Sequence, residues 1–285
     1  MDFTERLNYY LGENFYNEDD KKKLNNINQL ILNNNITIHN NYDKKLHNLL
    51  SKTGHLDKPF IWFRGDNEKQ NNTIILVKNR TNFDKNGVIL RCLRYDRHWS
   101  HYYNKPTDIP FCKKKNIIFW RGASTGNESQ IGNRFSLVTK WYDKDKNIDI
   151  GFSKIVQRKE KYKGTVKGTE NIDTFLKYKY ILSVRGNDKD SGLQWKLNSN
   201  SVVLMTQPSV TTWLMESTLV PDFHYVLLKD DFSDLKEKLD WCNNNQDKCK
   251  DIIKNANLFM IQFEDEKKEE ELEIAVINKY FKLLE

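Results

Sequence analysis

Short apolar runs, each closed by a polar turn, recur along the chain from residue 117 onward. They read IIFWRG from residue 117, DIGFS from 149, YILSVRG from 180, NSVVLM from 200 and HYVLLKD from 224. Runs of this length between turn-forming residues are typical of buried strands. Residues 133–142, between the first two runs, have the spacing of a helix. Strands that alternate with helices predict an α/β fold with a parallel sheet.

Further segments also have helical spacing. Residues 211–219 (TTWLMESTL) and 232–245 predict two helices, and Ser233 is a candidate N-cap for the second. The charged tail from 250 to 285 predicts a helix whose apolar stripe consists of Leu272, Ile274, Ala275, Ile277, Tyr280 and Phe281. Nearer the N-terminus we expect helical turns within residues 21–50 and strands at KPFIWFRGD and NTIILVKNR.

Composition narrows the class of protein. With 285 residues, 38% of them hydrophobic and 30% charged, the chain is long enough for two folded domains. Its net charge is +7, but the lysines are interspersed with aspartates, which favours a solvated basic surface over a nucleic-acid site. No apolar run reaches the ~20 residues of a membrane span, and the N-terminus lacks the layout of a signal peptide. We therefore expect a cytoplasmic protein with no transmembrane segment and no nucleic-acid partner.

An Arg-Gly pair follows an apolar run three times, at Arg64-Gly65, Arg121-Gly122 and Arg185-Gly186. Glycine lets the backbone approach a ligand closely, and a guanidinium offers planar donors that suit a diphosphate. The alternative is an ordinary turn with a surface arginine. Near the third pair, Lys196 offers a second positive charge and Ser191 a hydroxyl group for a sugar or a phosphate. Glu216 is placed either to accept ribose hydroxyls or simply as an exposed helix acid.

The residues around the second and third pairs resemble glycosyltransferase family 90. The resemblance lies in FWRGASTG, in KYKYILSVRGN with SGLQWKLNSNSVVLM, and in WLMESTLVPDFHYVLLKDDFSDLKEKLDWC. It runs from about residue 60 to residue 263. It implies a GT-B fold, in which two Rossmann-like domains face a cleft. We place an acceptor-side domain at residues 1–112, with a C-terminal helix at 264–285 packing back on it, and a nucleotide-sugar-binding domain at 113–263.

The resemblance also implies residue roles. Asp66 corresponds to the catalytic base of the family, although Gly65 is inserted before it and the register is open. Lys196 stands where the family usually has arginine, and Ala123 stands where some members have serine, so Ser124 or Thr125 takes that contact. The implied donor-binding residues are Trp120, Arg121, Gly122, Ser124, Arg134, Asp149, Arg185, Gly186, Ser191, Lys196 and Glu216.

On the acceptor side, Trp99, Tyr102 and Tyr103 are candidates for stacking on a sugar, with core packing as the alternative. The implied activity is inverting transfer of xylose or glucose from a UDP-sugar to a hydroxyl of a glycan. The compact glycan-modifying members of the family favour xylose. The UDP-sugar is a co-substrate, and neither a metal nor a cofactor is expected. The competing hypotheses are a non-catalytic module that binds a nucleotide-sugar or glycan, and a nucleic-acid-binding protein.

Overall fold

The computed structural model describes residues 1–12, 41–60, 62–63, 65–66, 75–81, 87–93 and 107–285, without the side chains of residues 41 and 42. Contacts between Cα atoms divide the chain into two compact units. Unit 1 consists of Met1–His98, Ser209–Ser217 and Asp265–Glu285, and unit 2 consists of Trp99–Pro208 and Thr218–Glu264. Each unit is described separately below.

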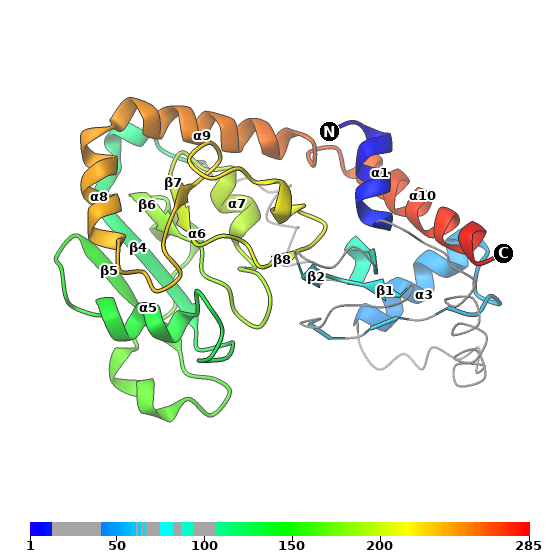
Figure 1. The fold of residues 1–285 in the computed structure, drawn as a ribbon, viewed down its shortest axis with the longest axis horizontal. Helices are drawn as coiled ribbons and strands as arrows, with labels where there is room; N and C mark the ends of the chain where they lie inside the picture. The colour runs from blue at the N-terminus through cyan, green and yellow to red at the C-terminus, as the bar shows by residue number, and fades with distance from the viewer. Residues whose placement is uncertain (13–40, 61, 64, 67–74, 82–86, 94–106) are drawn as a thin grey trace. The chain divides into compact units, whose positions relative to one another are not determined.

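Unit 2 is built on a parallel sheet with the strand order β5-β4-β6-β7-β9 (Figure 1). All five predicted strands are present, and the α/β class with a parallel sheet is confirmed. The strands are β4 (Lys115–Ala123), β5 (Ile148–Lys154), β6 (Tyr178–Leu182), β7 (Val202–Met205) and β9 (Val226–Leu227).

Helices cover both faces of this sheet because successive side chains of a strand point to opposite faces. On one face, Ile118 and Trp120 of β4 pack with apolar residues of α5, α8 and α9. On the other face, Phe119 packs with Phe175 of α6 and Trp195 of α7. The helices are α5 (Arg134–Trp141), α6 (Ile172–Phe175), α7 (Leu193–Leu197), α8 (Leu235–Asn244) and α9 (Gln246–Ile261), with 3-10 turns η3 (Phe111–Lys113) and η4 (Glu160–Thr165).

Two helix starts in unit 2 show how side chains set the boundaries. The predicted helix at 133–142 is confirmed as α5, and Asn133 caps it by accepting a hydrogen bond from the Ser136 amide at 2.8 Å. The predicted N-cap Ser233 of α8 is wrong, because the helix begins after Asp234. The Asp234 carboxylate accepts from the Lys229 amide at 3.1 Å and so fixes the turn that enters the helix.

Unit 1 contains small sheets and helices from distant parts of the chain. Strand β1 (Leu76–Val77) pairs in parallel with β3 (Val88–Ile89), and β2 (Arg80–Thr81) pairs antiparallel with β8 (Val210–Thr211). The helices are α1 (Phe3–Leu11), α3 (Asn41–Thr53) and α10 (Glu266–Leu284), with the 3-10 turns η1 (Arg91–Leu93) and η5 (Glu216–Thr218), the latter at the boundary with unit 2.

The first and last described helices of the chain pack together. Arg6 of α1 forms a buried two-pronged ion pair with Glu269 of α10, in which Nη2 lies 2.9 Å from Oε2. On α10 the buried side chains include Leu272, Ile277 and Tyr280 of the predicted stripe, together with Val276, which the stripe omitted. Within the described residues, no helix combines the length and apolar composition that a membrane crossing requires.

The predicted helix at 211–219 is wrong. Residues 210 and 211 form β8, and only residues 216–218 make a helical turn, of the 3-10 type. The Glu216 carboxylate accepts hydrogen bonds from the amide and hydroxyl of Thr212, and Met215 adopts a left-handed backbone with φ 59°. These local side-chain bonds compete with helix formation, and the pairing of β8 with β2 holds the segment extended at its start.

Candidate functional site

The strand order of unit 2 has its switch point between β4 and β6. Numbered in chain order, the strands run 2-1-3-4-5 across the sheet, and the order reverses between the first and the third. In such sheets the loops after these two strands leave in opposite directions, and ligands bind at the carboxyl ends between them. The loops concerned are residues 124–132 after β4 and 183–192 after β6.

Two glycines allow these loops to touch. A Cβ at Gly186 would lie 2.6 Å from the Thr125 hydroxyl, and one at Gly126 would lie 2.7 Å from the Gly186 carbonyl oxygen. Gly126 has φ 101°, a conformation that other residues rarely adopt. Its amide donates to Asn187 Oδ1 at 2.9 Å. Gly186 was predicted as a site residue, and the structure shows that any side chain there would separate the loops.

A third loop, after β5, joins the same cluster through Gln157. Its Oε1 accepts from the Gly126 amide and its Nε2 donates to Asn187 Oδ1, both at 3.1 Å. Gln157 and Arg158 both have a left-handed backbone with φ 56°, which costs energy for residues other than glycine. The sequence analysis did not single out Gln157, because an exposed glutamine in a loop carries no recognisable signal.

Arg134 holds the loops after β4 and β6 together. Its guanidinium donates to Ala123 O and Thr125 Oγ1 at 2.8 Å on one side, and to Val184 O and Arg185 O at 3.1 and 3.0 Å on the other. The side chain is 9% exposed. Burial lowers the pKa of Arg134, although Asp190 and Asp188 oppose this shift. Arg134, which was predicted as a donor-binding residue, is therefore a buried positive charge that holds the two loops together.

Lys196 occupies a similar buried position. Its ammonium group pairs with the Asp190 carboxylate and donates to the Leu182 carbonyl oxygen at 2.9 Å. Asp190 also accepts from the Ser183 hydroxyl at 3.0 Å and from the Gly192 amide at 2.9 Å. Burial lowers the pKa of Lys196; for Asp190, burial alone would raise the pKa, but Lys196 and Arg134 hold it below its usual value. This pair sets the shape of the loop after β6.

The structure places Arg121 apart from Arg134. Its guanidinium lies over the Phe119 ring, 4.5 Å from the centroid, and donates to Asp149 Oδ1 at 2.8 Å. Asp149 also pairs with Lys167 at 3.0 Å, so two of the predicted donor residues, Arg121 and Asp149, form one charged cluster on the β4–β5 side of the sheet. Trp120 is 1% exposed and belongs to the core.

Other predicted donor residues differ in their exposure. Ser124 is fully buried, and its hydroxyl donates to Val156 O at 2.9 Å and accepts from the Val156 amide at 2.7 Å. Gly122 lies against Trp120, whose ring would be 2.6 Å from an added Cβ. Ser191 is exposed, and Arg185 is half-buried at the start of its loop.

Two predicted residues belong to unit 1. Asp66 forms an ion pair with Lys78, and its side chain is 24% exposed. Glu216 is 1% exposed, and both its oxygens accept from Thr212, at 2.6 and 2.8 Å. The alternative of an exposed helix acid is therefore wrong. The predicted acceptor residues Trp99, Tyr102 and Tyr103 lie outside the described residues. Across the part of the chain that is described, no cluster of three or more His, Cys, Asp or Glu side chains is placed to hold a metal ion.

Buried charges hold the loops at the carboxyl edge of the sheet. Arg134 and Lys196 are both buried there, and the carboxylates of Asp190 and Asp188 lie close enough to interact with them. The fold is that of a doubly wound α/β domain, and the candidate site lies at the switch point of its sheet.

The family follows from comparison with known proteins. Residues 90–285 match the family model described as Glycosyl transferase family 90, and the chain belongs to this family. This confirms the resemblance found in the sequence, and it extends the match through α10. Asp66 lies before the matched region.

Three relatives illustrate the similarity. The chain is 34% identical to O-glucosyltransferase LpsA of Dichelobacter nodosus over 73% of this chain and 62% of that protein. It is 32% identical to human protein O-glucosyltransferase 3 over 53% of this chain and 29% of that protein. It is also 35% identical to the uncharacterized protein 179R of invertebrate iridescent virus 6, over 29% of this chain and 8% of that protein. The chain thus spans less than two thirds of the length of these relatives.

Proposed function

We propose that this chain is an inverting, metal-independent glycosyltransferase of GT-B type that moves a sugar from a UDP-sugar to a hydroxyl of a glycan. Membership of family 90 supports sugar transfer. The observation that carries the proposal is the switch point between β4 and β6, where Arg134 ties together the two loops that meet there. This is the position at which doubly wound domains bind nucleotides.

On the donor side, we assign two kinds of role. Arg185, Ser191 and the amides of the loop after β6 contact the diphosphate and the sugar. Arg134 and Lys196, which are bonded to carbonyl oxygens and to Asp190, hold the loops in shape and contribute positive potential from below. As the bond between the anomeric carbon and the diphosphate breaks, charge grows on the departing phosphate oxygen, and these fixed cations stabilise it without a metal.

On the acceptor side, we assign Asp66 as the general base. Its carboxylate takes the proton of the acceptor hydroxyl while that oxygen forms its bond to the anomeric carbon from the face opposite the diphosphate, which inverts the configuration. The ion pair with Lys78 orients the Asp66 carboxylate before the acceptor arrives. Trp99, Tyr102 and Tyr103 are assigned to stacking on the acceptor sugar.

For the transferred sugar we favour glucose over xylose. The support is the names of the relatives, since both LpsA and human protein O-glucosyltransferase 3 are named as O-glucosyltransferases. Both donors carry the same UDP group, so the assignments at the diphosphate do not depend on this choice.

The first experiment is a donor screen. Nucleotide release from UDP-, GDP- and CMP-sugars is measured with and without chelator, for the wild type and for Asp66→Asn. We expect slow release from UDP-glucose, insensitive to the chelator and lost in the variant. Chelator-sensitive release would contradict the metal-independent mechanism. UDP binding without turnover, even with a panel of glycan acceptors, would identify a binding module instead of an enzyme.

A second experiment tests the donor loop. Arg185→Ala is expected to weaken UDP binding about tenfold or more in calorimetric titration, because a charged hydrogen bond to phosphate is worth about 1.5–3 kcal/mol. Arg158→Ala, which removes an exposed arginine from the loop after β5, is the matched control and should change the Kd less than twofold. An unchanged UDP affinity in Arg185→Ala would remove this residue from the donor site.

A further inference from the structure

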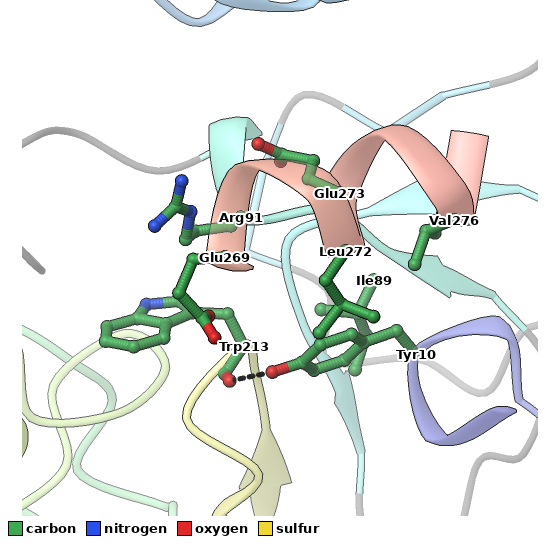
Figure 2. A pocket seen from close by; sticks show the side chains of 8 residues that line it. All are labelled: Tyr10, Ile89, Arg91, Trp213, Glu269, Leu272, Glu273 and Val276. Atoms are coloured by element: carbon green, nitrogen blue, oxygen red, sulfur yellow. Dashed lines mark hydrogen bonds between the residues drawn. The ribbon is translucent and has the colours of Figure 1, made fainter. Parts of the chain in front are cut away.

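The pocket described in unit 1 is too small for a ligand. Its lining includes Tyr10 of α1, Trp213 and Glu269 of α10 (Figure 2). The cavity measures about 10 Å³, which leaves room for about one water molecule and none for a sugar. Beside it, the Tyr10 hydroxyl donates to the Trp213 carbonyl oxygen at 2.6 Å. A further ligand site is therefore to be sought among exposed charges on the surface of the protein.

The segment that follows β5 in unit 2 has a large excess of positive charge. We call residues 154–168 (KIVQRKEKYKGTVKG) the basic loop. It contains six lysine or arginine residues but a single carboxylate, Glu160, so its net charge is +5 out of the +7 of the whole chain. This loop departs from the interspersed lysines and aspartates that otherwise favoured a merely solvated surface.

The basic loop is anchored at its ends and in its middle. The end of the loop returns beside β5, where the Lys167 amide donates to the Phe152 carbonyl oxygen at 2.9 Å. Midway, Tyr162 of η4 packs against Phe135 and Phe152, with ring centroids 5.0 and 5.7 Å apart. Compact surface loops whose ends lie close together and whose own side chains pack them are frequently functional. The packing thus fixes the backbone from which the charged side chains project.

The start of the basic loop is bonded to the loops of the candidate site. The Lys154 carbonyl oxygen accepts from the Ser124 amide at 3.1 Å, and the Gln157 side chain bonds to the loops after both β4 and β6. Arg158 follows directly. The left-handed backbone of Gln157 and Arg158, with φ 56° at each, persists only where the surroundings enforce it, and such strain clusters at ligand sites. The basic loop is therefore continuous with the switch-point site.

The cations of the basic loop differ in how far they are neutralised. Lys159 and Lys161 share the carboxylate of Glu128. Lys154 and Arg158, by contrast, are exposed, and neither forms an ion pair with another described residue. Exposed cations without a carboxylate partner give a positive potential that attracts an anionic group. The charge balance therefore favours an anionic ligand next to the candidate site.

We propose that Lys154 and Arg158 bind the glycan acceptor through its anionic groups, phosphate or carboxylate. The inference rests on the proposed function, because it takes the switch-point site as the place of sugar transfer, and it narrows the acceptor to an acidic glycan. An acidic glycan neutralises the two cations as it binds, whereas a neutral one does not, so charge supplies the specificity. The connection of the loop to the candidate site favours a substrate over a lipid headgroup, which needs no such proximity.

The test uses two pairs of saccharides that differ only in charge. Phosphorylated mannopentaose is compared with the same saccharide after a phosphatase has removed its phosphate, and trigalacturonate is compared with its carboxyl-reduced form. In calorimetric titration at low ionic strength, the wild type should bind the charged member of at least one pair about fivefold to twentyfold more tightly. The pair that shows the preference identifies phosphate or carboxylate. Salt at about 0.5 M should reduce the preference, because exposed charges are screened.

A double variant locates the preference. Lys154→Ala combined with Arg158→Ala should reduce it to less than about twofold, while the Kd for UDP stays within about twofold of the wild type. The matched control combines Lys248→Ala with Lys254→Ala, which removes two exposed lysines from α9 and lowers the net charge equally. This control should retain the preference of the wild type.

A third variant has the opposite sign. Glu128→Gln removes the negative charge that Lys159 and Lys161 share, so more of the positive charge of the basic loop becomes available to a ligand. Binding of the charged saccharide should tighten by about twofold to fivefold, and binding of its neutral counterpart should not change. Weaker binding of the charged saccharide in this variant would contradict an electrostatic role of the loop.

The remaining outcomes separate the inference from the proposed function. Equal affinities of the wild type for charged and neutral saccharides, or equal losses in the double variant and its control, would overturn the inference. Binding to phosphatidylglycerol vesicles without binding of the saccharides would assign the basic loop to a membrane surface instead. A wild type that binds no UDP would overturn the proposed function itself, whereas one that binds UDP but neither charged saccharide would overturn only this inference.

Discussion

Each unit of the protein contains a lysine–aspartate pair at a predicted site residue, and the two pairs are buried to different depths. In unit 1, the side chains of Asp66 and Lys78 are 24% and 11% exposed. In unit 2, those of Asp190 and Lys196 are 11% and 4% exposed. The more exposed carboxylate was predicted from the family resemblance as the base, and the more buried lysine as a phosphate ligand.

The difference in burial distinguishes a charge pair with a structural role from one that is accessible for catalysis. Asp190 and Lys196 are bonded to each other and to the Leu182 carbonyl oxygen, the Ser183 hydroxyl and the Gly192 amide, so the charges serve the loop that contains them. Removing either partner of such a buried pair leaves an uncompensated charge and destabilises the protein. Asp66 retains access to solvent, which a base needs if an acceptor hydroxyl is to reach it. The sequence shows where a charged residue lies in the chain, but the burial of its side chain determines whether it can have a structural or a catalytic role.

The largest expected effect is on catalysis, from Asp66→Asn. The amide keeps the shape of the side chain but accepts no proton, so kcat should fall by a factor of about 10² to 10⁴. The Kd for UDP should remain within twofold of the wild type, because the base contributes to the acceptor side. Single-turnover kinetics with UDP-glucose and UDP titration measure the two quantities.

The control for this variant is Asp231→Asn, which breaks an exposed ion pair with Lys140 in unit 2 and should leave kcat unchanged. If Asp66→Asn retained more than about half of the wild-type kcat, the base would be another residue.

The next effect is on stability, from Lys196→Met. The substitution leaves the Asp190 carboxylate in its buried position without its lysine partner, which typically costs about 3–5 kcal/mol. Urea denaturation should show this loss in the free energy of unfolding. UDP binding should weaken as well, since the loop after β6 loses the bond from Lys196 to the Leu182 carbonyl oxygen.

A double variant sharpens the result. Asp190→Asn combined with Lys196→Met removes both charges, and it should recover part of the stability lost in the single variant. If the single variant were as stable as the wild type, or if the two losses simply added, the pair would not be the coupled structural unit described above.

Much of the fold could be predicted from the sequence because the buried sheet leaves a strong pattern. The runs at β4 and β6 have apolar residues on both faces, as parallel strands covered by helices do, whereas the edge strand β5 alternates apolar residues with Asp149, Gly151 and Ser153. The structure of residues 211–217 could not be predicted. These residues have helical spacing, but all except Ser217 are buried, and the bonds from Thr212 to Glu216 replace those of a helix.

The turns after β4 and β6 could be predicted from the sequence, but the bonds within and between them could not. Turns after β4 and β6 were expected to meet a ligand, and the structure brings Gly186, Arg134 and Thr125 together there. The sequence did not reveal that Ser124 and Lys196 are turned inward, because an inward hydroxyl or ammonium group depends on partners such as Val156 and Asp190. Partners brought together by folding leave no local pattern.

The smallest expected effect is on thermal stability, from a substitution of Glu128 in the most exposed of these charge clusters. Glu128, after β4, accepts from Lys161 at 2.6 Å, from Lys159 at 3.1 Å and from the Tyr162 hydroxyl at 3.1 Å. The bond from Lys161, followed by those from Lys159 and Tyr162, lowers the pKa of Glu128 from 4.5 to about 2. Because the folded pKa is the lower one, the stability it contributes is present above pH 4.5 and is lost as the pH falls through about 2.

Glu128→Gln should therefore lower Tm by no more than about 2 °C at pH 7, since exposed ion pairs are screened by water and salt. The difference from the wild type should shrink in 1 M salt and disappear near pH 2, as thermal unfolding across pH would show. A Tm loss at pH 7 as large as that of Lys196→Met, or one insensitive to salt, would mean that exposure does not separate the two kinds of charge pair. The contrast between buried and exposed pairs would then fail as a guide to which carboxylates in this protein are available for chemistry.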